Sequence, residues 1–551
     1  MLVTKLVSSL EKPFLDSSLS DYPSLESLSA LQHERVHFQV LYTLSEPVSR
    51  SVRLRVRCDA PVSVTLRALD SVPVRFPVYP FVQDPQYLRR RPGLYPDCLS
   101  PLQYDSTVAA LYGQLQSVWV TLDTADLSGS YEISVSFSDN SGAEVSVQKL
   151  TLTVVGTALP EPPLFFTEWF HLDCIARWHH TDMFSEQHWV LIEKYLSVAV
   201  RNGINTILTP VLTPPLDTEV GWQRPNAQLV DIRLDNGTYT FDFAKLDRWV
   251  ALCRSLGIRA YEISHLFSQW GAAHAPEIYA IVDGESKRIF GFDTDALNEP
   301  AYPNFLSSFL PALTAHLAEL GILRNCFFHI SDEPNLSCLE NYKKAQSLVL
   351  PYLEGCPIID AMSDVELYTS GISRLPVSST NVIHRFIDAG AAPNLWAYYC
   401  CGEHTAVSNR YIAMPSVRTR CISAQLFKYH IQGFLHWGFN FFFNMGSRDL
   451  VNPYLDGSGG TWVPAGDAFQ VYPSPDGNPL ESIRLTIFHD ALQDIAAFSL
   501  CASIYGHERV VKELEDILGI IRFDICPSSP QVFLKARMRI NDLISAGLAA
   551  R

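Results

Sequence analysis

The feature that most constrains the fold is a pattern that occurs three times between residues 185 and 331. Each time, an amphipathic helix leads through a glycine into an apolar strand. SEQHWVLIEKYLSVAVRNG precedes INTILTPVL, FAKLDRWVALCRSLG precedes IRAYEIS, and FLSSFLPALTAHLAELG precedes ILRNCFFHIS. Gly203, Gly257 and Gly321 stand where a helix end favours a left-handed residue. The strands are apolar on both faces, which is typical of parallel strands covered by helices.

Further strand candidates bring the pattern to eight between residues 165 and 440. FFTEWFHLD comes before the three repeats, and CPIIDAM, TNVIHRF, LWAYYCC and GFLHWGFN follow them. Eight such units favour a (β/α)8 barrel of the TIM type over an open doubly wound sheet, and no G-x-G-x-x-G turn supports the latter. In such a barrel the chemistry lies at the carboxyl ends of the strands.

The region before residue 157 has a different period. VHFQVLYTL, VRLRVRC, VSVTLRAL, SVWVTLDT, YEISVSFS and VQKLTLTVV alternate apolar and polar residues, which predicts an antiparallel β-sandwich. RRRPGLYPDCLSPLQ (residues 89–103) is expected to be a surface loop. The prolines of TALPEPPLFF mark a boundary. We therefore predict a sandwich over 1–158, a catalytic barrel over 159–505 and a C-terminal helical tail over 506–551.

Charge and cysteine usage narrow the class of protein. A formal charge of -16 disfavours nucleic acid or an anionic membrane as a partner. No apolar run is long enough to span a bilayer, and the N-terminus lacks the apolar stretch of a secretory signal. The 12 cysteines are scattered, without a C-x-x-C pair, which fits a reducing compartment. These features predict a cytoplasmic protein without a membrane span.

The stretch HISDEP, His329 to Pro334, follows the fourth strand candidate. Pro334 cannot donate to a strand ladder, so it ends the strand and leaves Asp332 and Glu333 at the active face of the barrel. An alternative is that the two acids only precede the helix NLSCLENYKKAQSLVL, where they would meet its dipole favourably. The residues at the other strand ends favour the catalytic interpretation.

Aromatic and polar side chains follow the other strand candidates. We predict that substrate is bound by Glu168, His171, His265, Trp270, Tyr398, Tyr399, Asn409, Arg410, Trp437 and Asn440. Aromatic rings stack on the apolar faces of pyranoses, and acids, amides and arginine bind hydroxyl groups, so this set suits a carbohydrate. Two carboxyl groups in one pocket can act as acid and anion, as glycoside hydrolysis requires. This chemistry needs no metal and no organic cofactor.

Five stretches resemble glycoside hydrolase family 123, and most closely the uncharacterised relatives that share its barrel domain. They are EWFHLDCIA, INTILTPVLTPPLDTEVG, HISDEPN, YYCCGEHTAVSNR and GFLHWGFNFF, and the resemblance covers roughly residues 160 to 500. The characterised members are exo-acting β-N-acetylgalactosaminidases that use substrate assistance. The resemblance implies a retaining mechanism with Glu333 as general acid/base and Asp332 polarising the acetamido group.

Two alternatives remain open at this point. Glu168 or Glu262 could be a direct nucleophile about 5 Å from Glu333, as in ordinary retaining enzymes. The chain could also be a non-catalytic glycan-binding protein on a glycosidase scaffold, because fold does not dictate function. The sequence leaves the sugar, its linkage, the aglycone and homo-oligomer formation open.

Other motifs give weaker indications. His33, Glu34 and His37 spell H-E-x-x-H, but zinc binding needs both histidines on one helix face and this stretch runs into a strand. WHHTD lies in a loop after the first barrel strand, where a surface or hydrogen-bonding role is expected. The glycine-rich stretch DGSGGTWVPAGDAF is expected to shape the pocket rim through Trp462 and Asp467.

Overall fold

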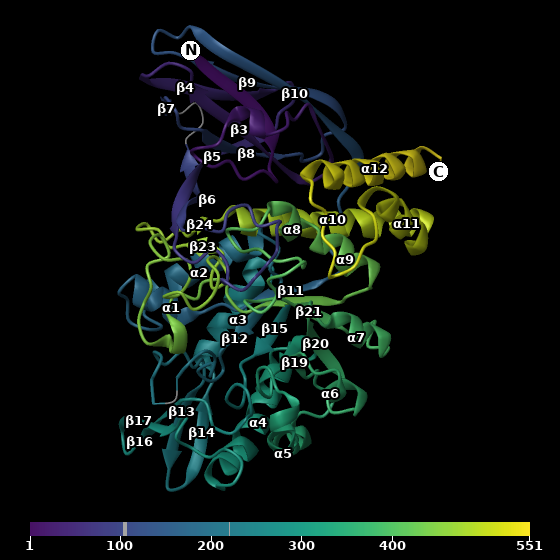
Figure 1. Cartoon of the computed structure of the whole chain (residues 1–551). Coiled ribbons are helices and arrows are strands. Elements are labelled where there is room, and N and C mark those ends of the chain that lie inside the picture. Colours follow the sequence, from purple (N-terminus) through teal and green to yellow (C-terminus); the bar gives the residue numbers. More distant parts are fainter. Residues whose placement is uncertain (103–106, 220, 551) are drawn as a thin grey trace.

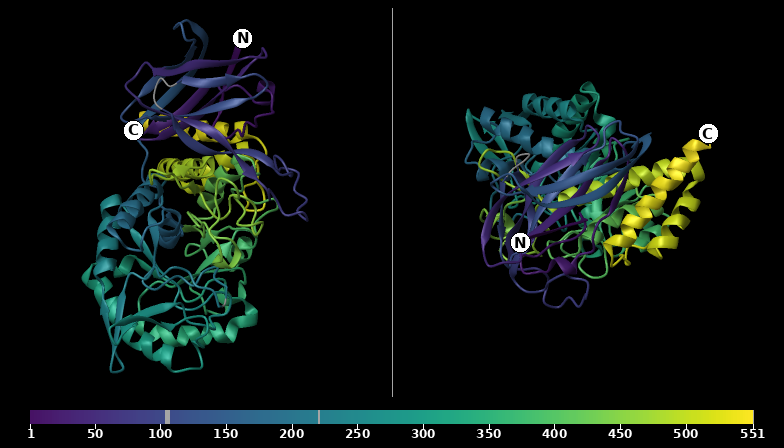
Figure 2. Two further views of the ribbon diagram at one scale, coloured as in Figure 1. Left: turned by 90° about the vertical axis from the view of Figure 1, so that its left-hand side faces the viewer. Right: turned by 90° about the horizontal axis from the view of Figure 1, so that it is seen from above.

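The computed structural model describes residues 1–102, 107–219 and 221–550. A sheet domain at the N-terminal end stands on one side of a larger domain built around parallel strands (Figure 1). C-terminal helices lie between the two, as the second view also shows (Figure 2). The expected order of sheet domain, barrel and helical C-terminal end is therefore present, while the predicted domain boundaries stay predictions.

The N-terminal domain consists of two five-stranded sheets that share one apolar core. In spatial order, the first contains β1 (Leu2–Ser8), β3 (Arg35–Leu44), β8 (Gln116–Asp123), β5 (Ser63–Val74) and β6 (Gly93–Leu102), and the second contains β2 (Ser27–Gln32), β10 (Glu144–Ala158), β9 (Gly129–Ser138), β4 (Ser49–Cys58) and β7 (Thr107–Leu111). All pairs are antiparallel except β2 with β10. The six predicted strands are present, and β1, β2, β6 and β7 were not predicted.

The loop predicted over residues 89–103 is wrong for most of its length. Gly93–Leu102 is strand β6, which pairs with β5 at the edge of the first sheet. Prolines 96 and 101 obscured the strand in the sequence, but an edge strand tolerates residues without an N–H. Tyr95 and Leu99 of β6 are buried. Gln103, the last residue of the predicted loop, lies outside the described residues.

The second domain contains an eight-stranded parallel barrel that is nearly closed. The strands are β11 (Phe165–Glu168), β12 (Thr206–Thr209), β15 (Ala260–Ile263), β18 (Cys326–Phe328), β19 (Ile359–Met362), β20 (Leu375–Ser379), β21 (Trp396–Tyr398) and β22 (Gly433–His436). Neighbouring strands pair in parallel around the ring, and the remaining gap between β18 and β19 is bridged at Phe328 and Ile358.

Helices lie between consecutive barrel strands. They are α1 (Leu172–Trp178), α2 (Glu186–Arg201), α3 (Ala244–Leu256), α4 (Ala301–Glu319), α5 (Leu339–Val349), α6 (Glu366–Thr369), α7 (Ile383–Asp388), α8 (Ser416–Arg420) and α9 (Ile422–Lys428), and α10 (Ile483–Tyr505) follows β22. Gly257 ends α3 with φ 103°, as predicted. A four-stranded sheet is inserted after β12 and β15, in the order β14 (Thr238–Asp242), β13 (Asp231–Asp235), β16 (Ile278–Val282) and β17 (Glu285–Phe290). β23 (Val471–Tyr472) pairs with β24 (Leu480–Glu481).

One of the eight strand predictions is wrong. The stretch TNVIHRF contains the start of helix α7, and the sixth strand is the preceding LPVSS of β20. Ile383 and Phe386 are three residues apart and both are buried, which is helix spacing rather than strand alternation. The strand escaped detection because a proline and two serines interrupt its apolar character.

The C-terminal helices connect the barrel to the sheet domain. Helix α12 (Pro530–Ala549) contacts α10, α11 (His507–Leu518) and strands β2 and β10. Buried ion pairs of Arg537 on α12 fix this contact: its guanidinium lies 2.8 Å from Glu34 of the sheet domain and 3.2 Å from Asp494 of α10. In the described residues, no helix is long and apolar enough to cross a bilayer. All 12 cysteines lie in the described part and are free thiols. The cytoplasmic location stays a prediction.

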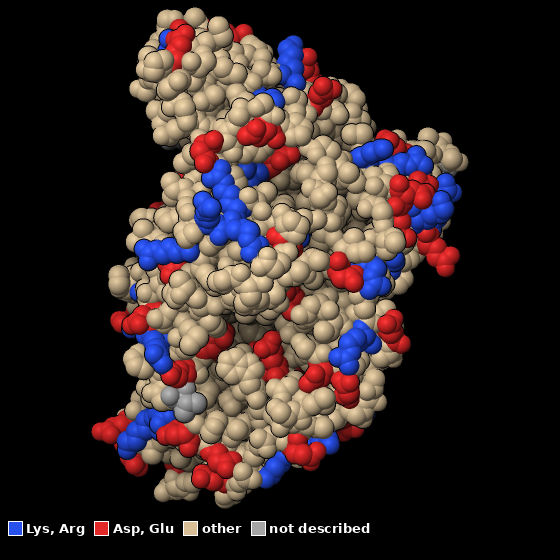
Figure 3. Space-filling model, in the orientation of Figure 1, with Lys and Arg blue, Asp and Glu red and all other residues tan. Residues whose placement is uncertain are grey.

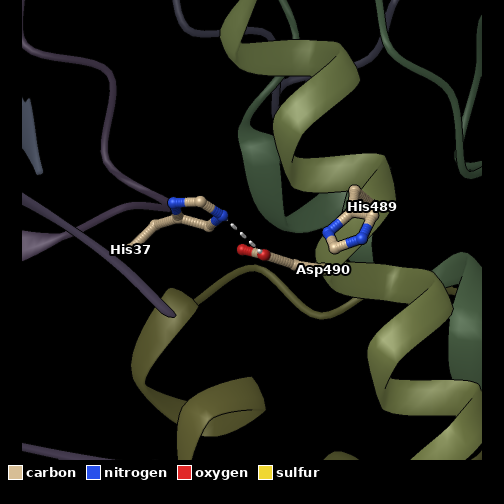
Figure 4. A group of neighbouring side chains, drawn as sticks. All are labelled: His37, His489 and Asp490. Carbon is tan, nitrogen blue, oxygen red and sulfur yellow. Dashed lines mark ion pairs between the residues drawn. The ribbon is translucent and has the colours of Figure 1, made fainter. Parts of the chain in front are cut away.

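The literal H-E-x-x-H motif does not assemble a metal site of its own. His33 lies in a turn with φ 61° and its side chain is exposed, whereas His37 is buried in β3. His37 instead faces Asp490 of α10, with 3.4 Å between Nε2 and Oδ1, beside His489 (Figure 4). The strand context predicted from the sequence is confirmed.

Candidate functional site

A cavity of about 370 Å³ opens at the carboxyl ends of the barrel strands. Its lining is rich in aromatic rings and carboxyl groups, and includes Trp169, Asp217, Gln269, Trp270, Asp332, Glu333, Tyr398, Cys400, Cys401, Leu435, Trp437, Met445, Arg448 and Trp462. The barrel face is hollowed near its middle, with acidic side chains beside the hollow (Figure 3). Aromatic walls with a few polar groups are typical of a small-molecule site.

The adjacent acids Asp332 and Glu333 both line this cavity. Consecutive residues on a regular strand point in opposite directions, but Glu333 has φ 48°, in the left-handed region. This turn of the backbone directs both carboxyl groups to one side. The alternative interpretation, acids that cap the next helix, is not supported, because the side chain of Asn335 caps that helical turn by accepting from the Ser337 N–H.

Each acid is held by hydrogen bonds from residues of the loop after β15. The Trp270 indole N–H donates to Glu333 Oε2 at 3.1 Å, and Gln269 Nε2 donates to Asp332 Oδ2 at 2.6 Å. Gln269 Oε1 accepts the Asp217 N–H at 3.0 Å, which fixes the orientation of the Gln269 amide. From β21, the Tyr398 hydroxyl donates to Glu333 Oε1 at 3.0 Å. The carboxyl pair is thus preorganised.

Burial and neighbouring charges alter the proton affinity of these acids. Burial, followed by the charges of Glu333 and Asp217, raises the pKa of Asp332 well above its ordinary value. Burial likewise raises the pKa of Asp217 to about 7. Like charges this close cannot all ionise easily, so the site favours retention of a proton. A retained proton is what a general acid needs.

Another part of the wall is built by Trp437, which directly follows β22, and by Trp462 of the glycine-rich loop. Trp437 and Trp462 both line the cavity, with ring centroids 5.5 Å apart. Asp467 is buried behind them and accepts a hydrogen bond from Trp437 Nε1 at 2.9 Å. Burial raises the pKa of Asp467 to about 7. In this loop Trp462 faces the cavity, and Asp467 holds Trp437 from behind.

The predicted site residues divide into two groups. Trp270, Asp332, Glu333, Tyr398 and Trp437 line the cavity. The other predicted residues are buried behind its wall and have protein partners or ring contacts there: Glu168, His171, His265, Tyr399, Asn409, Arg410 and Asn440. In this structure these side chains lie behind the cavity wall, and their contact with substrate stays a prediction.

The supporting contacts are specific. Glu168 forms a fully buried ion pair with Arg410, whose guanidinium lies 5.7 Å from the Tyr399 ring. The His171 N–H donates to Asn440 Oδ1 at 2.8 Å, and Asn440 returns a bond to the His171 carbonyl at 3.0 Å.

Asn409 steadies the turn that carries two of the cavity residues. Its Nδ2 donates to the carbonyls of Cys400 and Glu403, both at 2.8 Å. Cys400 and Cys401 line the cavity.

A charged cluster lies inside the barrel below the carboxyl pair. His329 Nε2 lies 2.9 Å from Glu262 Oε2, and its Nδ1 lies 3.4 Å from Asp360. Burial lowers the pKa of His329, but the two carboxylates outweigh burial and raise it to about 9. His265 stacks on His329 with centroids 4.2 Å apart and planes 25° apart. Ligand atoms of His265, His329 and Asp360 lie within 4.8 Å of one another, but the nitrogens of His329 already face the Glu262 and Asp360 carboxylates.

Glu168 and Glu262 do not fit the role of direct nucleophile. Glu168 is committed to Arg410, and Glu262 accepts bonds from Trp169 and His329. Both carboxyl groups are fully buried and neither lines the cavity. The sequence reasoning missed two carboxyl groups of the lining, both in the loop after β12: Glu219, which pairs with Arg448, and Asp217. The signal of Asp217 was weak: a single acid that ends the apolar, proline-rich stretch LTPPLD.

Comparison with known proteins agrees with this site. The model of the glycoside hydrolase 123 catalytic domain matches residues 169–501. A family 123 glycoside hydrolase from Clostridium perfringens, studied for glycolipid glycan hydrolysis, has a similar fold, with a TM-score of 0.75 and 14% identity over 100% of this chain and 98% of that chain.

Other matches are looser. A β-glucuronidase from Parabacteroides merdae reaches a TM-score of only 0.33 at 9% identity, over 90% of this chain and 52% of its own. A sequence search of curated proteins finds no match. The family model spans more than half of the chain and includes the Asp332–Glu333 pair. The chain therefore belongs to glycoside hydrolase family 123 and is a glycoside hydrolase.

Proposed function

We propose that the protein is a retaining exo-glycosidase that removes terminal β-linked N-acetylhexosamine, with N-acetylgalactosamine as the leading candidate, by substrate-assisted catalysis. The observation that carries this proposal is the placement of two adjacent carboxyl groups, Asp332 and Glu333, in one aromatic cavity. Adjacent acids suit a reaction in which the substrate supplies the nucleophile, because one acid can orient that nucleophile while the other protonates the leaving oxygen.

In the first step Glu333 gives its proton to the glycosidic oxygen as the bond to the anomeric carbon breaks. The carbonyl oxygen of the 2-acetamido group attacks that carbon from the opposite face, and a cyclic oxazolinium forms. Asp332 accepts the hydrogen bond of the acetamido N–H and stabilises the positive charge. Gln269 also donates to Asp332 at 2.6 Å, so in the complex two donors favour the anion of Asp332 and oppose the effect of burial.

In the second step Glu333, now a carboxylate, takes a proton from water as the water oxygen attacks the anomeric carbon. The cyclic bond breaks, the acetamido group is restored, and two inversions give net retention. The Trp270 N–H and the Tyr398 hydroxyl, at 3.1 and 3.0 Å from the Glu333 oxygens, stabilise this carboxylate. The rings of Trp437 and Trp462 offer stacking surfaces for the sugar.

Variants of the pair test the proposal on 4-nitrophenyl β-glycosides of N-acetylgalactosamine, N-acetylglucosamine, galactose and glucose. We expect wild type to cleave only the acetamido sugars and Asp332→Asn to lose that activity. Glu333→Ala should retain cleavage of the activated aryl glycoside when azide is added, with a β-glycosyl azide as product, because azide replaces the water that needs a base. Glu340→Gln, an exposed acid on α5, is the matched control. Full activity of Glu333→Gln on a substrate with a poor leaving group would refute the acid assignment.

A second mechanism has one observation in its favour, the presence of Asp217 in the cavity. As a direct nucleophile Asp217 would allow cleavage of sugars without an acetamido group. Its pKa of about 7 opposes this, because much of the population is protonated at neutral pH. Turnover of the plain hexosides, lost in Asp217→Asn, would establish the second mechanism. Glycan binding without turnover of any substrate would instead indicate a binding protein.

A further inference from the structure

A segment of the sheet domain forms part of the active face of the barrel. Residues 75–92 connect β5 to β6 and lie on barrel loops. The Ala465 N–H donates to the Phe76 carbonyl at 2.9 Å, and Arg418 Nη2 donates to Asp84 Oδ2 at 2.6 Å. The side chains of Asp84 and Arg418 are 3% and 1% exposed, so this ion pair is out of solvent. The segment is therefore held firmly against the barrel.

The segment presents an aromatic cluster with one open face. Tyr79 and Phe81 are stacked, with centroids 5.3 Å apart and planes 11° apart. The His404 ring, from a barrel loop, meets both edge-on at 5.7 and 5.4 Å. Phe81 nevertheless remains 67% exposed. One face of its ring is covered by Tyr79, so the exposed part is a rigidly oriented aromatic surface rather than a mobile side chain.

This cluster adjoins the catalytic cavity. His404 belongs to the same barrel loop as Cys401, which lies three residues earlier in the chain, and Cys401 lines the cavity. The same segment also supports the loop that carries Trp462, through the bond between Phe76 and Ala465. The cavity, at about 370 Å³, is near the small end of the range for ligand sites, roughly 300–1,000 Å³. A terminal sugar would fill it, and the next sugars of an oligosaccharide would lie outside its rim.

We infer that Tyr79, Phe81 and His404 form a subsite for the leaving-group sugar of an oligosaccharide substrate. This inference rests on the proposed function, since the cluster adjoins the cavity assigned to the terminal sugar. A pyranose has an apolar face that packs on an open aromatic ring, and Phe81 offers such a ring at the edge of the cavity. The sheet domain thereby contributes directly to substrate selection.

The test compares a disaccharide with its terminal sugar. The probes are β-N-acetylgalactosaminyl-galactose and methyl β-N-acetylgalactosaminide, and kcat/KM is measured for each. We expect Phe81→Ala to lower the disaccharide-to-methyl ratio of kcat/KM roughly three- to tenfold, the range of one aromatic contact. Phe81→Trp should restore the ratio. Tyr112→Ala, which removes a 54% exposed aromatic ring elsewhere in the sheet domain, should leave the ratio unchanged.

Calorimetry with Glu333→Gln protein provides a readout that does not need turnover. In that background, Phe81→Ala should weaken binding of the disaccharide relative to binding of the monosaccharide by the same factor. An unchanged ratio in both assays, or equal losses for the two probes, would overturn the subsite. If wild type cleaves neither probe, the proposed function fails while the binding comparison still decides the subsite. Equal affinity of disaccharide and monosaccharide would then refute it.

Discussion

The hydrogen bond from Gln269 to Asp332 provides a quantitative test of the site. Gln269→Met removes the donor at 2.6 Å from Asp332 Oδ2 but nearly keeps the length and volume of the side chain. A hydrogen bond to a charged group contributes about 1.5–3 kcal/mol. Since one pKa unit corresponds to about 1.36 kcal/mol, its loss should raise the pKa of the buried Asp332 by about one to two units.

The sign of the effect follows from the mechanism. Asp332 must be an anion to accept the acetamido N–H, so activity falls on the acid side as the carboxyl pair gains its second proton. The bond from Gln269 lowers the pKa of Asp332. Without it the acid limb of kcat/KM should move to higher pH by about one to two units, so kcat/KM on the acid side of the wild-type limb should fall roughly ten- to hundredfold.

The assay is the pH profile of kcat/KM on an aryl N-acetylhexosaminide, with thermal unfolding as a check on folding. Gln346→Met is the matched control. Gln346 lies on α5, donates to the Ile372 carbonyl and does not line the cavity. A Gln269→Met protein with an unshifted acid limb would show that Asp332 does not act as an anion in the rate-determining step. The apparent pKa values belong to the coupled pair rather than to one residue.

Three further variants probe the surrounding structure. Trp270→Phe removes the N–H donor to Glu333 and should lower kcat on an aryl N-acetylhexosaminide roughly tenfold without loss of folding, as steady-state kinetics and circular dichroism would show. Arg410→Met leaves Glu168 buried and unpaired, so urea unfolding should show a loss of about 3–5 kcal/mol, and adding Glu168→Gln should recover part of it. Burial raises the pKa of Asp490 from 3.8 to about 7. The contribution of Asp490 to stability is therefore complete below about pH 4 and lost as the pH rises through 7. In Asp490→Asn the free energy of unfolding should therefore depend less on pH between about 4 and 7.

The sequence predicted that Asp332 and Glu333 lie at the cavity because barrel topology brings the carboxyl ends of distant strands together. The sequence does not show which of two neighbouring residues at a strand end faces the cavity, as Tyr398 and Tyr399 illustrate. Tyr398 lines the cavity, whereas Tyr399 points the other way and packs on Phe434 with centroids 4.8 Å apart. Side chains alternate along a strand, and the apolar runs here gave no indication of which residue faces inward. For the same reason the sequence did not show that Glu168 lies behind the cavity wall.

Loop residues are the other part that the sequence could not supply. Gln269 and Asp217 meet only because the loops after β12 and β15 fold over the same strand ends, and no periodicity constrains such loops. Nor does any periodicity place Phe81 near this site, because it lies about 250 residues before Glu333 and in a different domain. Yet Asp84, in the same segment, is buried against Arg418 of the barrel. A charge buried at a domain contact is stable only with its partner in place. The position of this segment is therefore specified as firmly as that of the barrel loops, and the active face is a product of both domains.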